Sequence, residues 1–303
     1  MTKKPVRDNN DLEPVKDVNV PDTDYPASEI GIARTDYVKK KPVRDIRSIV
    51  DDSGNPRYTN RILIGTASTG LVRVEWVASR YSQLIPVNWS QVEMREYLNG
   101  YYPLRYQVDD AQNLIVRACL EGDFEWLFLL EHDVLMPDNT FMLLNQYMRD
   151  VKIPVVSGLY YTRSRPSEPL IFRGRGTGAF VDFKLGDQVW CDGVPTGALL
   201  IHHSILRAMW NDSPEYMVTS RGAPQITRRV FDTPRNLWID PETKAHNATA
   251  GTSDLDWCTR IMDGGYFEKA GWSMDFCPDP ANPFLVDTRI FCKHINADGE
   301  QFP

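Results

Sequence analysis

An acidic tripeptide directly after an apolar run is the part of this sequence best suited to chemistry. Residues 126–130 are large and apolar, and Glu131, His132 and Asp133 follow them at once. Such a run is typical of a buried central strand of an α/β sheet, and open α/β sheets bind ligands just beyond the carboxyl ends of their strands. Buried carboxylates are costly without a partner. The tripeptide therefore predicts a divalent-cation site that holds a phosphorylated ligand, with a solvated acidic turn as the alternative.

Two carboxylates near the start of a predicted helix over residues 254–263 form a second candidate cluster. Asp254 and Asp256 project about 200° apart on a helix of 3.6 residues per turn. Asp254 shares a side with Cys258, which directs it inward or along a cleft and makes it the candidate general base. An acidic residue in the first turn also suits the helix dipole, which is the alternative explanation. Asp256 lies four residues before Arg260, so a surface ion pair is its expected role.

His294 is the third candidate. It lies on a predicted strand over residues 288–294, on the same face as Ile290 and Cys292. A histidine on an apolar face is more often a hydrogen-bonded core residue than a ligand, and a metal ligand is the alternative. The three candidate groups are far apart in sequence, so they can act together only if the fold brings them to one pocket.

Apolar periodicity predicts the elements that position these residues. Strands are expected over 61–66, 106–108, 126–130, 153–158, 196–201 and 288–294, and helices over 71–84, 109–122, 137–149, 203–210 and 254–263. One side of the first helix carries Val74, Val77, Tyr81 and Leu84. Residues 159–195 mix short β-like pieces, and residues 211–250 are rich in loops. This order predicts an α/β fold, with a mainly parallel, Rossmann-like sheet flanked by helices and a smaller antiparallel, loop-rich half.

The first 58 residues differ in composition from the rest. They contain few large apolar residues, which predicts an extended or partly disordered arm over 1–58 before a folded domain over 59–303. The net charge of -7 argues against general coating of nucleic acid. No apolar stretch is long enough for a membrane span, and scattered cysteines without a C-x-x-C pair predict free buried thiols in a reducing compartment. A soluble cytoplasmic protein is therefore expected.

The order of these pieces resembles the GT-A fold glycosyltransferases, and most of all the large family-2 type. In that family a D-x-D-like motif after a hydrophobic strand holds a divalent metal against a nucleotide-sugar diphosphate. Glu131, His132 and Asp133 match this motif in position, with Glu in place of the first Asp. Residues 194–201 resemble the strand beside the donor sugar, and residues 253–258 resemble the E-D-x-x-F/W element. The resemblance spans residues 61–296 and implies a nucleotide-binding half over 59–160 and an acceptor half over 161–303.

The resemblance also implies a role for each matching residue. Asp133 and His294, with Glu131 in direct or water-mediated contact, would hold Mn²⁺ or Mg²⁺, and the imidazole nitrogen favours Mn²⁺. Asp254 would take the proton of the acceptor hydroxyl, which implies inversion at the anomeric carbon. Donor contacts are expected from Thr66, Ala67, Ser68, Asp109, Asn113, His132 and Gly197, and acceptor contacts from Asp256, Trp257, Arg173 and Arg175. Ser253 stands where the family has Glu, which leaves the acceptor type open.

The partners of such an enzyme are a nucleotide-sugar, in the first place a UDP-sugar, and an acceptor with a hydroxyl group. Several arginines within residues 163–235 are explained either as scattered solvated side chains or as a surface for an anionic acceptor, such as modified nucleic acid or an acidic glycan. The sequence is compatible with a homo-oligomer. The competing function is a non-catalytic nucleotide- or sugar-binding module with the same fold.

Overall fold

A computed structural model of the chain describes residues 61–174, 178–219 and 224–303. The arm expected over residues 1–58, and Arg175, lie outside the described residues. Within the described ranges, no helix is both long and apolar enough to cross a membrane. All five cysteines are buried and free, as their scattered spacing predicted.

A six-stranded sheet forms the centre of the molecule. Its strands, in spatial order, are β1 (Ile62–Gly65), β2 (Trp126–Leu130), β6 (Ala198–His202), β4 (Val155–Leu159), β11 (Phe284–Phe291) and β5 (Gln188–Cys191). The pairs β1–β2 and β4–β11 are parallel, whereas β6 runs antiparallel to both β2 and β4, and β5 runs antiparallel to β11. Strands β1, β2, β4 and β11 therefore share one direction and two strands oppose them. The predicted fold class, mixed α/β with a mainly parallel sheet, is confirmed.

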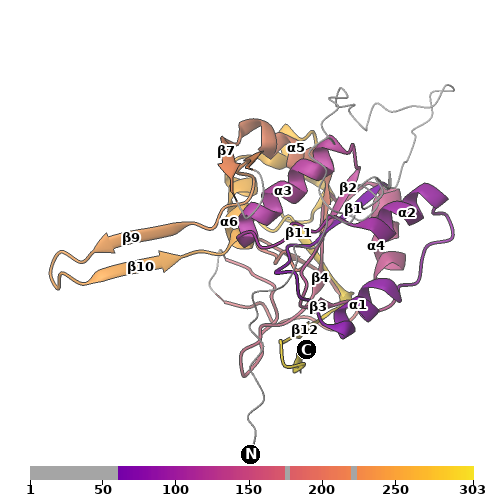
Figure 1. The fold of residues 1–303 in the computed structure, drawn as a ribbon, viewed down its shortest axis with the longest axis horizontal. Helices are drawn as coiled ribbons and strands as arrows, with labels where there is room; N and C mark the ends of the chain where they lie inside the picture. The colour runs from indigo at the N-terminus through magenta and orange to yellow at the C-terminus, as the bar shows by residue number, and fades with distance from the viewer. Residues whose placement is uncertain (1–60, 175–177, 220–223) are drawn as a thin grey trace, which may run out of the picture.

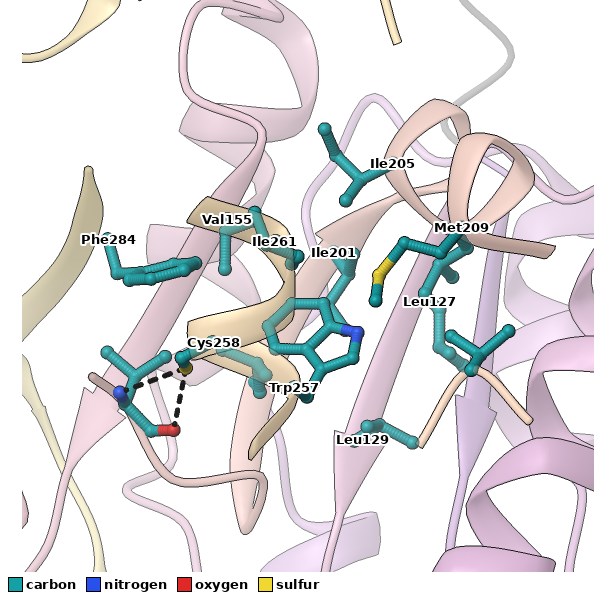
Figure 2. Close-up of a cluster of buried hydrophobic side chains, with 14 of the residues drawn as sticks. Leu127, Leu129, Val155, Ile201, Ile205, Met209, Trp257, Cys258, Ile261 and Phe284 are labelled. Atoms are coloured by element: carbon teal, nitrogen blue, oxygen red, sulfur yellow. Dashed lines mark hydrogen bonds between the residues drawn. The ribbon is translucent and has the colours of Figure 1, made fainter. Parts of the chain in front are cut away.

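Helices cover both faces of this sheet (Figure 1). One face packs against α3 (Val108–Glu121), α5 (His203–Asp212), α6 (Ser253–Asp263) and α7 (Tyr266–Lys269), and the other packs against α1 (Val74–Tyr81), α2 (Gln91–Asn99) and α4 (Thr140–Asp150). Alternate residues of β2 supply the two cores, with Leu127 and Leu129 on the first face and Trp126 and Phe128 on the second. Figure 2 shows the first core, where the fully buried indole of Trp257 lies among apolar side chains of the sheet and helices.

Helix α3 follows its predicted apolar stripe, and Ala111, Leu114, Ile115 and Cys119 are buried. A Cβ on Gly65 would lie 2.2 Å from Ile115, so the glycine allows α3 to approach β1 closely. The strand predicted over 106–108 is wrong, because Gln107 is already the N-cap of α3. In the described ranges, the preceding segment makes isolated bridges only, from Tyr101 to Gly65 and from Leu104 to Ser68.

Helix α1 is shorter than predicted and turned the other way. Its predicted apolar side faces solvent, with Val74 75% and Tyr81 46% exposed, whereas Trp76 and Arg80 are buried. The Trp76 indole donates to the Glu131 carbonyl at 2.8 Å, and this contact fixes which side of the helix faces the sheet.

Residues 211–250, predicted to be rich in loops, form two antiparallel hairpins. They are β7 (Glu215–Val218) with β8 (Gln225–Arg228), and β9 (Arg235–Ile239) with β10 (His246–Ala250). The second hairpin projects away from the body (Figure 1). A separate three-stranded sheet joins β3 (Val134–Leu135), β12 (Lys293–Ile295) and β13 (Gln301–Phe302), in the order β13-β12-β3. The single strand predicted over 288–294 is thus divided between the main sheet and this small one.

Candidate functional site

The polar residues that follow the strands meet at one edge of the main sheet, which we call the carboxyl edge. Residues 66–68 follow β1, residues 131–133 follow β2 and residues 160–163 follow β4, and these strands are parallel to one another. Residues 196–197 precede β6, which runs the opposite way and so begins at the same edge. Ligands of open α/β sheets bind at this position.

Glu131, Asp133 and His294 form a compact group at the carboxyl edge. One ligand atom from each residue lies within 4.8 Å of the others. The small sheet produces this proximity, because His294 of β12 pairs with Val134 of β3 and the Ile295 amide donates to the Asp133 carbonyl at 2.8 Å. Opposite ligands of a cation with metal–oxygen bonds of about 2.0–2.6 Å lie up to about 5 Å apart. The three side chains are therefore spaced to share one cation.

His294 is held in a form suited to metal binding. Its Nδ1 lies 2.5 Å from the Tyr161 carbonyl oxygen, which can only accept, so Nδ1 carries the proton and Nε2 is left with its lone pair. Burial lowers the pKa of His294 to about 4, so the ring is neutral at neutral pH. The Tyr160 ring packs at right angles against the imidazole, with 4.8 Å between ring centroids. Backbone and aromatic contacts thus fix both the tautomer and the ring.

The two carboxylates are incompletely satisfied by the protein. Asp133 Oδ1 is buried and has no hydrogen-bond partner in the described part of the chain, whereas Oδ2 pairs with Arg163. Burial raises the pKa of Glu131 to about 7, and the nearby charge of Asp254 adds to that effect. Within the described ranges, its side chain accepts one hydrogen bond, from the Thr196 hydroxyl at 3.3 Å. An unpaired buried carboxylate oxygen beside a second carboxylate and a neutral imidazole fits Mn²⁺ or Mg²⁺.

Asp254 lies in the first turn of α6, is half-buried, and is near enough to this group for its charge to act on Glu131. Its negative charge raises the pKa values of Glu131 and Tyr160, although burial is the larger cause in both. One carboxylate oxygen accepts the Leu255 amide at 2.8 Å. The helix begins one residue earlier than predicted, with Thr252 as its N-cap. Asp256 projects elsewhere, and its predicted ion pair with Arg260 is present at 3.7 Å.

The segment after β1 lies beside the acidic tripeptide. Burial lowers the pKa of His132, and a hydrogen bond between its ring and the Ala67 backbone opposes the shift. The Thr66 hydroxyl is buried without a hydrogen-bond partner in the described ranges. Ser68 Oγ accepts the Gly70 amide at 3.0 Å. The structure therefore brings Ala67 and His132 together.

Other predicted site residues are occupied within the fold. The side-chain Nδ2 of the buried Asn113 donates to Tyr216 Oη and the Phe231 carbonyl, and its Oδ1 accepts the backbone amides of Val230 and Phe231. Both ends of the side chain are therefore used within the fold, which leaves neither for the predicted contact with a nucleotide-sugar. Trp257 is fully buried and stacks on Phe231 at 5.3 Å, so its predicted acceptor contact is wrong. Asp109 accepts the Thr233 amide at 3.1 Å.

Gly197 and Arg173 also have structural contacts. The Gly197 amide donates to Tyr160 Oη at 2.6 Å, and a Cβ at this position would lie 2.3 Å from that oxygen. Gly197 therefore permits Tyr160 to approach β6. Arg173 Nε donates to the Trp190 carbonyl at 2.8 Å, and its guanidinium lies 3.8 Å from the Phe180 ring centroid.

Three residues that contact the group were not predicted as part of it, namely Tyr160, Arg163 and Thr196. All three lie at the carboxyl edge, directly after β4 or before β6. The signal that selects Glu131 and Asp133, polar residues at the end of a predicted apolar strand, also applies to the segment after residues 153–158. It would have drawn attention to Arg163.

Comparison with known proteins adds little. No protein-family model and no curated protein matches the chain. The crystal structure of A197 from STIV is similar with a TM-score of 0.45 and 13% identity, over 80% of this chain and 93% of that chain. A structure of CMP:2-keto-3-deoxy-manno-octonic acid synthetase complexed with CTP has a TM-score of 0.24 and 11% identity, over 75% of this chain and 88% of that chain. Likenesses this weak do not bear on function, and the family-2 resemblance stays a prediction.

Proposed function

We propose that the protein is a metal-dependent glycosyltransferase, which moves a sugar from a nucleotide-sugar to an acceptor hydroxyl. The observation that carries the proposal is the meeting of Glu131, Asp133 and His294 at the carboxyl edge, with Asp254 close enough for its charge to act on Glu131. Acidic groups held together in a half-buried site repel one another, and a cation relieves that repulsion. The same edge is where open α/β sheets bind nucleotides.

The reaction assigns different tasks to the two sides of the site. Asp133 Oδ1 and His294 Nε2 would bind the cation directly, with Glu131 as the third ligand. A cation held by these residues would supply positive charge to stabilise the departing diphosphate. Asp254 takes the proton from the acceptor hydroxyl while the hydroxyl oxygen bonds to the anomeric carbon. The bond from that carbon to the diphosphate oxygen breaks, and its electron pair leaves with the diphosphate.

A nucleotide-sugar panel tests the proposal. Thermal unfolding is measured for the full chain with UDP-, GDP-, ADP- and CMP-linked sugars, each with and without Mn²⁺. One donor is expected to raise the melting temperature only when Mn²⁺ is present. Asp133→Asn should lose this shift, and Asp212→Asn should keep it, because Asp212 pairs with Lys269 at the surface of α5. A panel without a metal-dependent shift would contradict the proposal.

Turnover separates the enzyme from a binding module with the same fold. Release of the nucleoside diphosphate from the identified donor, with Mn²⁺ and either water or a sugar acceptor, is expected of the enzyme. Tight donor binding without any release would favour the module.

A further inference from the structure

Arg163 is the only cationic side chain that pairs with the candidate metal ligands in the described ranges. Its guanidinium bonds to Asp133 Oδ2, while Asp133 Oδ1 remains buried and unpartnered. The Arg163 side chain is 41% exposed and that of Asp133 is 23% exposed. The pair thus lies at the boundary between the site and solvent, where a long side chain has room to move.

The positive charge of Arg163 reaches the whole group. It adds to the lowering of the pKa values of His132 and His294 that burial mainly causes, and it opposes the rise that burial causes in the pKa of Glu131. A cation bound to Asp133 and His294 would stand beside this guanidinium. Two positive charges bound to the same carboxylate repel each other strongly. Arg163 and a divalent cation therefore compete for Asp133.

The backbone that carries Arg163 is fixed on both sides. The Tyr161 carbonyl accepts from His294, and the Tyr161 amide donates to the Pro303 carbonyl at 3.2 Å. The Thr162 amide donates to the Glu168 carbonyl at 2.8 Å. The base of the Arg163 side chain therefore stays beside the site whichever anion its guanidinium contacts.

We propose that Arg163 alternates between two anions, the Asp133 carboxylate before the cation binds and the donor diphosphate afterwards. The inference rests on the proposed function and adds a diphosphate-binding residue to it. A guanidinium forms paired hydrogen bonds with carboxylates and with phosphates, so one side chain can serve both partners. The cation alone weakens the ion pair between Arg163 and Asp133 and offers the guanidinium no new partner. A nucleoside diphosphate supplies that partner.

Opposite effects on two ligands test the inference. In Arg163→Gln, Mn²⁺ alone should bind about 2–5-fold more tightly, because a competing ion pair of modest strength is removed. The tightest-binding of UDP, GDP, ADP and CDP, measured at saturating Mn²⁺, should bind about 10–100-fold more weakly, because a charge-assisted contact is lost. Both affinities are measured calorimetrically on the full chain. Arg165→Gln, two residues along the same loop, is the matched control and should change neither.

The outcomes separate the two proposals. Opposite shifts in Arg163→Gln support the exchange of anions. The exchange of anions would be overturned by weaker binding of both ligands, by an unchanged Mn²⁺ affinity, or by equal effects of Arg165→Gln. This holds even where the wild type binds Mn²⁺ and a nucleoside diphosphate as the proposed function requires. A wild type that binds neither would overturn the proposed function and this inference together.

Discussion

Asp133 and Asp287 are both acidic residues of the sheet region, but their carboxylates differ in how many hydrogen-bond partners they have. Asp287 is fully buried, and each of its oxygens is satisfied: Oδ1 accepts the Arg289 amide at 3.0 Å and Oδ2 accepts Tyr147 Oη at 2.8 Å, while the Arg289 guanidinium bonds to both. Asp133 has one oxygen paired and one buried without a partner in the described ranges. Burial of a carboxylate is common to both, so it does not identify a site. What distinguishes Asp133 is that its unpartnered oxygen belongs to a carboxylate grouped with Glu131 and His294.

The two surroundings lead to opposite expectations. Around Asp287, the chain itself supplies the donors, so removal of the carboxylate should damage the fold. Around Asp133, a second carboxylate, a neutral imidazole and Asp254 leave negative charge in excess, so removal should damage ligand binding and spare the fold. The following predictions test that contrast, from the largest effect to the smallest.

Asp254→Asn should lower the turnover of the donor about 10²–10⁴-fold, because an amide cannot take the proton of the acceptor hydroxyl. Donor affinity and the melting temperature should stay near wild type, since the side chain is only half-buried and the amide oxygen of Asn can still accept the hydrogen bond from the Leu255 amide. Rates at saturating donor and acceptor are the measurement. Loss of donor binding in this variant would count against the role of base.

Asp133→Asn should weaken Mn²⁺ binding by more than about 100-fold. Loss of a direct metal ligand should cost more affinity than loss of a residue that only hydrogen-bonds to a ligand. The free energy of unfolding without metal should change little. Calorimetric titration with Mn²⁺ and denaturation in urea are the two measurements. An unchanged Mn²⁺ affinity would refute the metal assignment.

Asp287→Asn should show the reverse pattern. We expect a loss of about 2–4 kcal/mol in the free energy of unfolding, at the lower end of values for broken buried pairs because Arg289 is 37% exposed. Mn²⁺ affinity of the folded variant should match the wild type. If this variant lost Mn²⁺ binding while Asp133→Asn kept it, the contrast between the two carboxylates would be reversed.

Gly197→Ala should affect both stability and Mn²⁺ binding. Its added methyl group would collide with Tyr160 Oη, and Tyr160 packs against His294. Overpacking of this kind costs about 1–3 kcal/mol, and the displaced Tyr160 should also weaken Mn²⁺ binding slightly. The double variant with Tyr160→Phe, which removes the colliding oxygen, should recover part of the stability in thermal unfolding.

The sequence predicts well where local pattern decides the structure. The five apolar residues of β2 and the stripe of α3 both form the expected elements, because each pattern has one period over its whole length. Glu131 and Asp133 follow from the rule that strand ends bind ligands. Helix α1 shows the limit of this reasoning. Its period shows which residues share a side, but contacts from Trp76 to Glu131 decide which side is buried, and these span 55 positions.

The site was predictable only in part for the same reason. His294 reaches Asp133 through pairing of β12 with β3, and no local pattern sets a register between residues so far apart. Asn113 has the position expected of a donor contact, but the hairpin β7–β8 and the residues after it use its amide. A single polar residue on a helix has the same appearance in sequence whether it binds a ligand or a neighbouring segment.

A crystal of the full chain grown with Mn²⁺, with diffraction data collected at the manganese absorption edge, tests the central claim most directly. We predict one anomalous peak bonded to Asp133 Oδ1 and His294 Nε2, next to Glu131, with the Arg163 guanidinium moved away from Asp133. Absence of a peak at these residues, when Mn²⁺ is bound elsewhere or not at all, would contradict the account.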